Sequence, residues 1–287
     1  MKKKRYKLKD MFKDAYKETK RSSLLVYLVL RFLVIACMVL KIIHGILENA
    51  LLCVMSLFLL LLPSFIEHKL NITLPNTLEI IIYLFIFSAE ILGEINNFYG
   101  IIPYWDTILH TLNGFLCAAV GFSLVNLLEK SSNKINLSPM YLCIVAFCFS
   151  MTIGVLWEFF EYGSDKIFKL DMQKDHIVSW ISTVELNPLN ENKAIIVENI
   201  DKTIMYNKNG QELATINGGY LDIGINDTMK DLIVNFIGAL TFCFFGFFFL
   251  KFSKHDKFIK NFVPTKGRRE VPEVILKKIS ESKEKKI

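Results

Sequence analysis

Six apolar runs, each about 20 residues long, constrain the fold of this chain more than any other feature. A helix rises about 1.5 Å per residue, so a run of this length crosses roughly 30 Å of hydrocarbon. Helices suit that setting because they satisfy their own backbone hydrogen bonds. We therefore predict an all-α integral membrane protein, a six-helix transmembrane bundle. The predicted spans are about Leu24–Ile43, Ile46–Ile66, Leu78–Ile95, Asp106–Leu128, Met140–Tyr162 and Asp227–Phe252.

The segment between the fifth and sixth runs has a different character. Apolar density falls, and short β-branched runs occur at Ile177–Val184, Ala194–Val197 and Thr203–Tyr206. Asn209-Gly210 then precedes another such run, which is a hairpin signal. We predict a small extracytoplasmic β-rich insert at 163–226. Its polar start, near Asp171–His176, either covers a site at the membrane or is a solvated linker.

The distribution of charge predicts the orientation in the membrane. Residues 1–22 and 251–287 each carry an excess of seven positive charges, whereas residues 164–226 carry an excess of three negative charges. Loops rich in Lys and Arg stay in the cytoplasm. We therefore expect both termini in the cytoplasm of a bacterial plasma membrane, with the lipid bilayer as partner. The basic ends need no nucleic acid. Arg31 lies inside the first run, and if that run did not span, the two ends would lie on opposite sides.

These expectations divide the chain into five parts. They are a cytoplasmic basic arm (1–22), helices one to five (23–162), the insert (163–226), helix six (227–252) and a cytoplasmic basic tail (253–287).

Polar residues recur at fixed helical spacings near the ends of the apolar runs. Asp106, His110 and Asn113 fall on one helix face, and Asp227 and Asp231 open the last run in the same way. Glu158 and Glu161 close the fifth run three residues apart, and Glu90 and Glu94 close the third run four apart. Ionisable groups in lipid are rare and usually face a protein interior. We therefore interpret the starts of the fourth and sixth runs and the end of the fifth as one site beneath the outer face.

Some of these residues have structural alternatives. Asp106 and Asp227 suit the N-cap of a helix, where a carboxylate accepts from exposed amides. Asn113, Gly114 and Asn235 suit close helix–helix packing. Capping does not account for His110, Glu158 or Asp231, which lie about one turn inside their helices.

Clustered carboxylates with one imidazole suit three kinds of chemistry. They bind a divalent metal, perform general acid–base catalysis, or relay protons or cations. The chain has no Walker loop, dinucleotide fingerprint or His-Glu-x-x-His motif. The candidate metal ligands are Asp106, His110, Glu158, Glu161, Asp227 and Asp231, and the candidate catalytic residues are Glu158, His110 and Asp231.

Three functions remain open at this point. The first is a metal-assisted enzyme acting on envelope lipids or lipid-linked sugars, with His110 and Asp231 binding or polarising and Glu158 as base. The second is a proton- or cation-coupled transporter with Arg31 or Lys230 as counter-charges. The third is a non-enzymatic scaffold whose insert binds a partner.

The order of these motifs resembles that in the VanZ-like and YjdF-like groups of bacterial multi-helix membrane proteins. The matching positions are Asp106 and His110, then Glu158 and Glu161, then Asp227 and Asp231. The resemblance implies a plasma-membrane protein linked with the cell envelope. The Lys-, Ile- and Asn-rich composition indicates a Gram-positive source.

Overall fold

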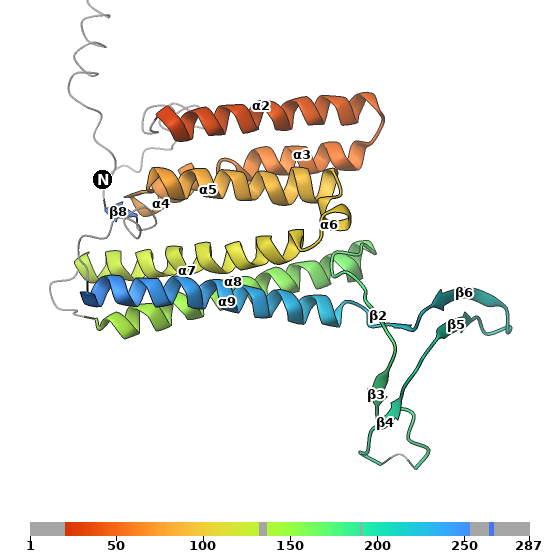
Figure 1. Ribbon diagram of the computed structural model, residues 1–287. Coiled ribbons are helices and arrows are strands. Elements are labelled where there is room, and N and C mark those ends of the chain that lie inside the picture. The colour runs from red at the N-terminus through yellow and green to blue at the C-terminus, as the bar shows by residue number, and fades with distance from the viewer. Residues whose placement is uncertain (1–20, 132–136, 190, 253–263, 267–287) are drawn as a thin grey trace, which may run out of the picture. The chain divides into compact units, whose positions relative to one another are not determined.

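The computed structural model describes residues 21–131, 137–189, 191–252 and 264–266. The described residues belong to two compact units, one drawn from Met1–Met151 and Asn235–Ile287 and the other from Thr152–Val234. Most of the predicted basic arm and most of the predicted basic tail lie outside the described residues. Figure 1 shows a helical protein with a short stranded segment.

Helices make up most of the described chain. They are α2 (Arg21–Ile43), α3 (Leu47–Leu59), α4 (Leu62–Leu70), α5 (Asn76–Ile86), the π-helix η1 (Phe87–Ile95), α6 (Phe98–Ile101), α7 (Trp105–Ser131), α8 (Pro139–Phe168) and α9 (Ile225–Phe252).

Five helical segments among the described residues have the length and composition needed to cross a membrane. They are Ser22–Ile43, Leu47–Lys69, Trp105–Asn126, Pro139–Phe168 and Ile225–Phe248. Each overlaps most of one predicted run, including the run that contains Arg31. The remaining predicted run is divided between α5 and η1, which follow each other without a gap. Five candidate spans are therefore established by length and composition, and a sixth stays a prediction.

The third predicted run has an irregular second half. In η1 the backbone hydrogen bonds join residues five apart, which makes it a π-helix. An example is the bond of 3.1 Å from the Asn96 amide to the Ile91 carbonyl. Gly93 lies under the ring of Tyr99, and a Cβ there would come within 2.4 Å of the ring. The Trp105 indole donates to the Ser88 carbonyl at 3.3 Å. These contacts connect η1 to the first turn of α7.

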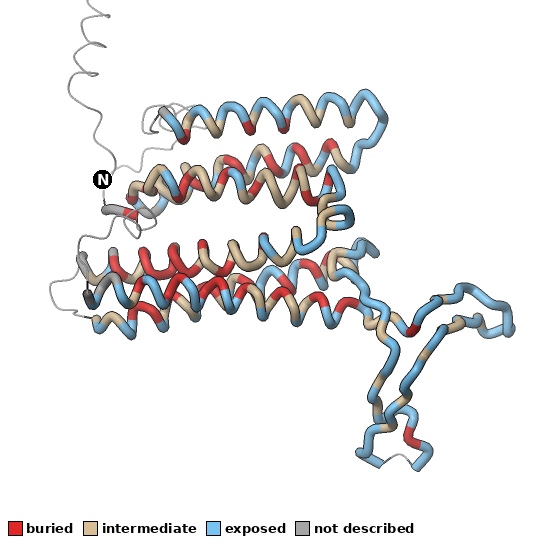
Figure 2. The backbone as a smooth tube through the Cα atoms, viewed as in Figure 1, coloured by how far each residue is buried: buried red, intermediate tan, exposed pale blue. Residues whose placement is uncertain are grey.

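One apolar core joins α5, α7, α8 and α9 within the first unit. Phe122 on α7 and Phe242 on α9 are almost completely buried, and their rings meet edge to face with centroids 5.8 Å apart. Ala118, Ala119 and Ala239 are fully buried around them. Figure 2 shows the buried positions running along these helices while many other positions stay exposed. A second core lies among α2, α3, α5 and η1.

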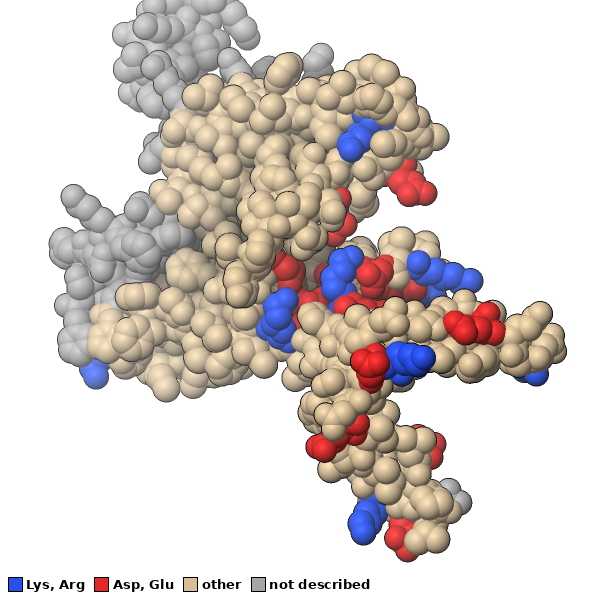
Figure 3. Space-filling model, turned by 45° about the vertical axis from the view of Figure 1, so that its right-hand side comes forward, with Lys and Arg blue, Asp and Glu red and all other residues tan. Residues whose placement is uncertain are grey.

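Exposed apolar side chains cover the outside of the helices. Phe32, Phe58 and Phe244 are each more than half exposed although they lie within candidate spans. On the face shown in Figure 3, the sides of the helices are almost free of charged residues. An apolar outer surface of this kind matches lipid as its solvent.

The segment between α8 and α9 contains only short antiparallel strands. They are β2 (Ile177–Val178), β3 (Ile181–Thr183), β4 (Ile195–Val197), β5 (Lys202–Tyr206), β6 (Glu212–Asn217) and β7 (Tyr220–Leu221). The pairs are β2 with β7, β3 with β4, and β5 with β6. The β5–β6 pair confirms the hairpin predicted from Asn209-Gly210. In the first unit, β1 (Ile72–Thr73) pairs with β8 (Thr265–Lys266).

The helices on either side of this segment are longer than predicted. α8 continues to Phe168 rather than ending at Tyr162, and α9 begins at Ile225 rather than Asp227. Ser164, buried in this extra stretch of α8, donates to the Phe160 carbonyl at 2.8 Å. The non-helical segment is therefore shorter than the predicted insert.

The polar stretch that follows α8 is fixed by hydrogen bonds. Both oxygens of Asp165 accept backbone amides, from Met172 at 2.7 Å and from Gln173 at 2.9 Å. The Gln173 side chain bonds to Thr228 on α9. The stretch Asp171–His176 is thus hydrogen-bonded and largely exposed, and its role as a cover or as a linker stays a prediction.

Candidate functional site

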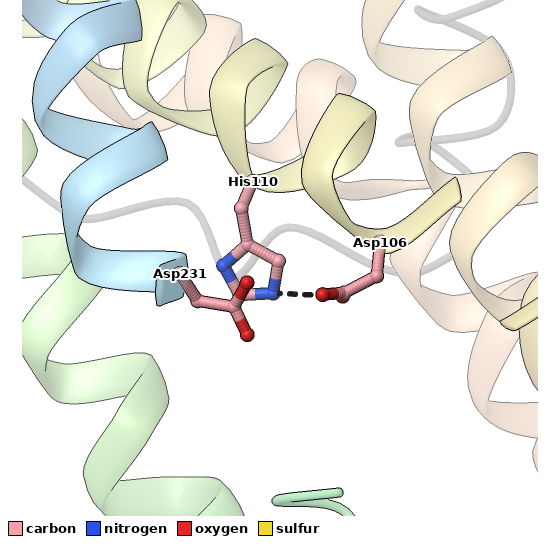
Figure 4. Close-up of side chains that lie close together, drawn as sticks. All are labelled: Asp106, His110 and Asp231. Atoms are coloured by element: carbon pink, nitrogen blue, oxygen red, sulfur yellow. Dashed lines mark ion pairs between the residues drawn. The ribbon is translucent and has the colours of Figure 1, made fainter. Parts of the chain in front are cut away.

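The first polar group lies on α7, as the spacing predicts. Asp106 is in the first turn and His110 one turn later, and the His110 Nε2 atom lies 3.3 Å from the Asp106 Oδ1 atom. Figure 4 shows this ion pair as a dashed line. The two side chains are 26% and 13% exposed, respectively. Because the carboxylate faces one ring nitrogen, it orients the imidazole ring.

The helix N-cap role predicted for Asp106 and Asp227 is wrong. α7 begins at Trp105 and α9 begins at Ile225, so both carboxylates lie inside the first turn. Such a position still benefits from the positive end of the helix dipole.

The carboxylate that precedes α9 is Asp222, which the sequence reasoning missed. It accepts the amides of His176 at 2.7 Å, Asn226 at 3.0 Å and Gly224 at 3.2 Å. Burial alone would raise the pKa of Asp222, but these amide donors hold it below its ordinary value. The signal in the sequence was Asp222 shortly before an apolar run, followed two residues later by Gly224. In the structure Gly224 has a positive φ.

The second polar group lies on the first two turns of α9. Asp227 and Asp231 are 5% and 1% exposed, and Lys230 lies between them. Its Nζ atom is 3.3 Å from Asp227 Oδ1 and 3.7 Å from Asp231 Oδ1. The other oxygen of Asp227 accepts the backbone amide of Lys174 at 3.0 Å. One oxygen of Asp227 therefore contacts Lys230 and the other contacts the Lys174 amide. These contacts orient the Lys230 side chain and anchor the segment that precedes α9.

The third polar group closes α8. Glu158 and Glu161 are buried, at 5% and 8% exposure. The indole nitrogen of Trp157 donates to Glu161 Oε1 at 2.8 Å. The neighbouring Trp157 and Tyr162 are exposed at 41% and 54%. Trp and Tyr side chains exposed in this way are typical of the membrane–water interface.

A polar layer one turn deeper joins α7 and α9 within the first unit. The Asn113 amide donates to the Asn235 Oδ1 atom at 3.2 Å, and Ser150 on α8 donates to the Gly114 carbonyl at 2.8 Å. A Cβ at Gly114 would lie 2.0 Å from the Asn235 carbonyl oxygen. These contacts confirm that Asn113, Gly114 and Asn235 serve close helix packing.

Glu90 and Glu94 are carried by η1. Glu90 is half-buried and Glu94 is exposed. Neither glutamate is among the described side chains that share metal-ligand geometry.

The fold and these polar groups define a multi-pass helical membrane protein. The chain matches the model of a predicted membrane protein family, DUF2238, over residues 25–179. That match covers more than half of the chain, so the chain belongs to this family.

Other comparisons add little about function. An uncharacterized protein of Thermotoga maritima is 29% identical over 105 residues, which is 37% of this chain. The chain spans about half the length of that relative, since the match covers 53% of it. No solved structure matches the chain. The likeness to VanZ-like proteins and the link with the cell envelope stay predictions.

Proposed function

We propose that this chain is a metal-dependent membrane enzyme that acts on a lipid or lipid-linked substrate near the outer face of the bilayer. In this proposal Asp106 and His110 on α7 and Asp231 on α9 hold one divalent cation. The single observation that carries it is that the His110 imidazole is held 3.3 Å from the Asp106 carboxylate (Figure 4), one turn before the Asn113–Asn235 contact between α7 and α9.

The packing of α7 against α9 supports this grouping. Asn113 and Gly114 contact Asn235 within the first unit. His110 lies one turn before Gly114, and Asp231 lies one turn before Asn235, on helices that are continuous. His110 and Asp231 are therefore each one turn N-terminal to the layer formed by Asn113, Gly114 and Asn235.

The ligand set fits a borderline or hard divalent ion. Two carboxylates and one imidazole suit Zn²⁺ or Mn²⁺. Three protein ligands leave positions open for water or substrate, where a bound metal would lower the pKa of water. Asp106 orients the His110 ring, and Glu158, buried on α8, is the proposed general base.

The surroundings favour a membrane substrate. The exposed Trp157 and Tyr162 beside Glu158 favour an interfacial depth. A substrate with an apolar tail and a polar head reaches this depth without leaving the bilayer. A lipid or lipid-linked sugar meets that requirement.

A transporter is less well supported. No charged residue occurs between Asn113 and Glu129 on α7 or between Asn235 and Lys251 on α9. The buried rings of Phe122 and Phe242 pack together in that stretch. A path for cations or protons along these helices would need polar groups there.

Elemental analysis of the purified protein tests the proposal. We expect one equivalent of a divalent metal in the wild type and its loss in His110→Ala and in Asp231→Asn. The control is Asp227→Asn, whose amide oxygen still accepts from Lys174 and which should retain the metal. A folded wild type that binds no divalent ion would refute the proposal. Cation flux into proteoliposomes would instead support the transporter.

A further inference from the structure

Lys230 has surroundings that the proposed metal site does not by itself explain. Its ammonium lies 3.3 Å from Asp227 and 3.7 Å from Asp231, so it is fixed beside a proposed metal ligand. Counted for the side chain alone, Asp227 and Asp231 are 8% and 2% exposed, whereas the Lys230 side chain is 40% exposed. The carboxylates thus hold the ammonium at the boundary between buried groups and solvent.

We infer that Lys230 binds the phosphate group of the substrate, so that the substrate class is a phosphorylated lipid or lipid-linked phosphate. This inference rests on the proposed metal site. A cation bound by Asp231 would share that carboxylate with the Lys230 ammonium. Two neighbouring positive charges of this kind attract an anion that has two oxygens to offer, one for each. Phosphoryl groups have this shape, and Lys with a metal ion is a recurrent way of binding them.

Asp227 holds the Lys230 ammonium in a fixed position. Its Oδ1 atom faces Lys230, and its Oδ2 atom accepts the Lys174 amide at 3.0 Å. The backbone bond fixes the carboxylate, and the carboxylate fixes the ammonium. Lys230 is therefore oriented before a substrate binds, which lowers the entropy cost of recognising an anion.

The balance of charge agrees with an anionic ligand. Among the groups that contact Lys230 or would hold the proposed cation, the three carboxylates of Asp106, Asp227 and Asp231 would be neutralised by one ammonium and one divalent cation; Glu158, the proposed base, is not counted. A neutral site of this kind accepts a phosphate dianion without the repulsion that the acidic residues would otherwise exert. A site meant for a cationic or neutral head group would not need the ammonium.

The test measures binding of short-chain phosphatidic acid and of diacylglycerol with the same acyl chains. The full chain is used in maltoside micelles, which contain no phosphate, after loading with Mn²⁺. We expect phosphatidic acid to bind at least about tenfold more tightly than diacylglycerol, consistent with one charge-assisted bond. Inorganic phosphate should compete with it. If inorganic phosphate binds as tightly as the lipid, the phosphate chemistry stands and its source is soluble.

Three variants distinguish recognition from a structural role. Lys230→Gln should lose the preference for phosphatidic acid, and Lys230→Arg should keep most of it. Lys174→Gln is the matched control, because its ammonium is 52% exposed and its backbone amide still bonds to Asp227. Equal binding of both lipids by the wild type, or an unchanged preference in Lys230→Gln, would overturn the inference. Metal content measured on the same samples separates this failure from failure of the metal site.

Discussion

Replacing Gly114 or Gly238 by alanine should force α7 and α9 apart. A Cβ at Gly114 would lie 2.0 Å from the Asn235 carbonyl oxygen, and a Cβ at Gly238 would lie 2.0 Å from the Thr111 carbonyl oxygen. Ordinary contact would require the helices to separate by about 1.4 Å. The obstacle is backbone in both cases, so no side-chain rotation relieves it.

The expected cost follows from the contacts that separation disturbs. Overpacking in a close-packed interior costs about 1–3 kcal/mol. Separation at Gly114 would also weaken the Asn113–Asn235 bond and the bond from Ser150. Interhelical hydrogen bonds in membranes average about 0.6 kcal/mol. Alanine gains about 0.8–1.0 kcal/mol over glycine in a helix, so we expect each variant to lose about 2 kcal/mol of unfolding free energy net of that gain.

The assay is reversible unfolding in maltoside micelles titrated with dodecyl sulfate, followed by helical circular dichroism. Gly246→Ala on the same helix is the matched control, because the nearest atom to its Cβ would be 3.7 Å away. Alanine favours a helix over glycine by about 0.8–1.0 kcal/mol, so this variant should be as stable as the wild type or more stable. Equal stability of Gly114→Ala, Gly238→Ala and Gly246→Ala would refute the reasoning.

Three further predictions concern single contacts. Ser150→Ala removes the donor to the Gly114 carbonyl and should cost about 1 kcal/mol in the same titration, with no loss contradicting the bond. Gly93→Ala should cost less than Gly114→Ala, because the Tyr99 ring that obstructs it can turn away. The pKa of Asp222 is lowered from 3.8 on folding, so its stabilising effect is present above that value and is lost as the pH falls through the lower folded value. Asp222→Asn should therefore speed hydrogen exchange of the amides that donate to it at neutral pH, whereas the wild type should keep its protection down to about pH 5. Equal exchange in both proteins would contradict this role.

Much of the fold could be predicted from periodicity and length. An apolar run near 20 residues has few alternatives to a helix in lipid, so α2, α7, α8 and α9 were expected within a few residues. The spacing of Asp106 and His110 fixed their common face, and Asn209-Gly210 fixed the hairpin. These are local properties, and local properties can be deduced from sequence.

The remaining features depend on partners distant in the chain. The π-helix at η1 is accompanied by contacts from Tyr99 and Trp105 that no run of apolar residues reveals. The position of Asp227 in the sequence suits an N-cap or a metal ligand. In the structure its Oδ2 atom accepts a hydrogen bond from the Lys174 backbone amide. Spacing alone cannot distinguish a metal ligand from a carboxylate that binds an amide 53 residues away.

Manganese paramagnetic resonance tests the central claim most directly, because it reports both the ion and its ligands. The account predicts one bound Mn²⁺ per chain, with coupling to an imidazole nitrogen that disappears in a folded His110→Ala variant. Asp231→Asn should weaken binding, and Asp227→Asn should leave the spectrum unchanged. Free Mn²⁺ only, or nitrogen coupling that survives without His110, would contradict it.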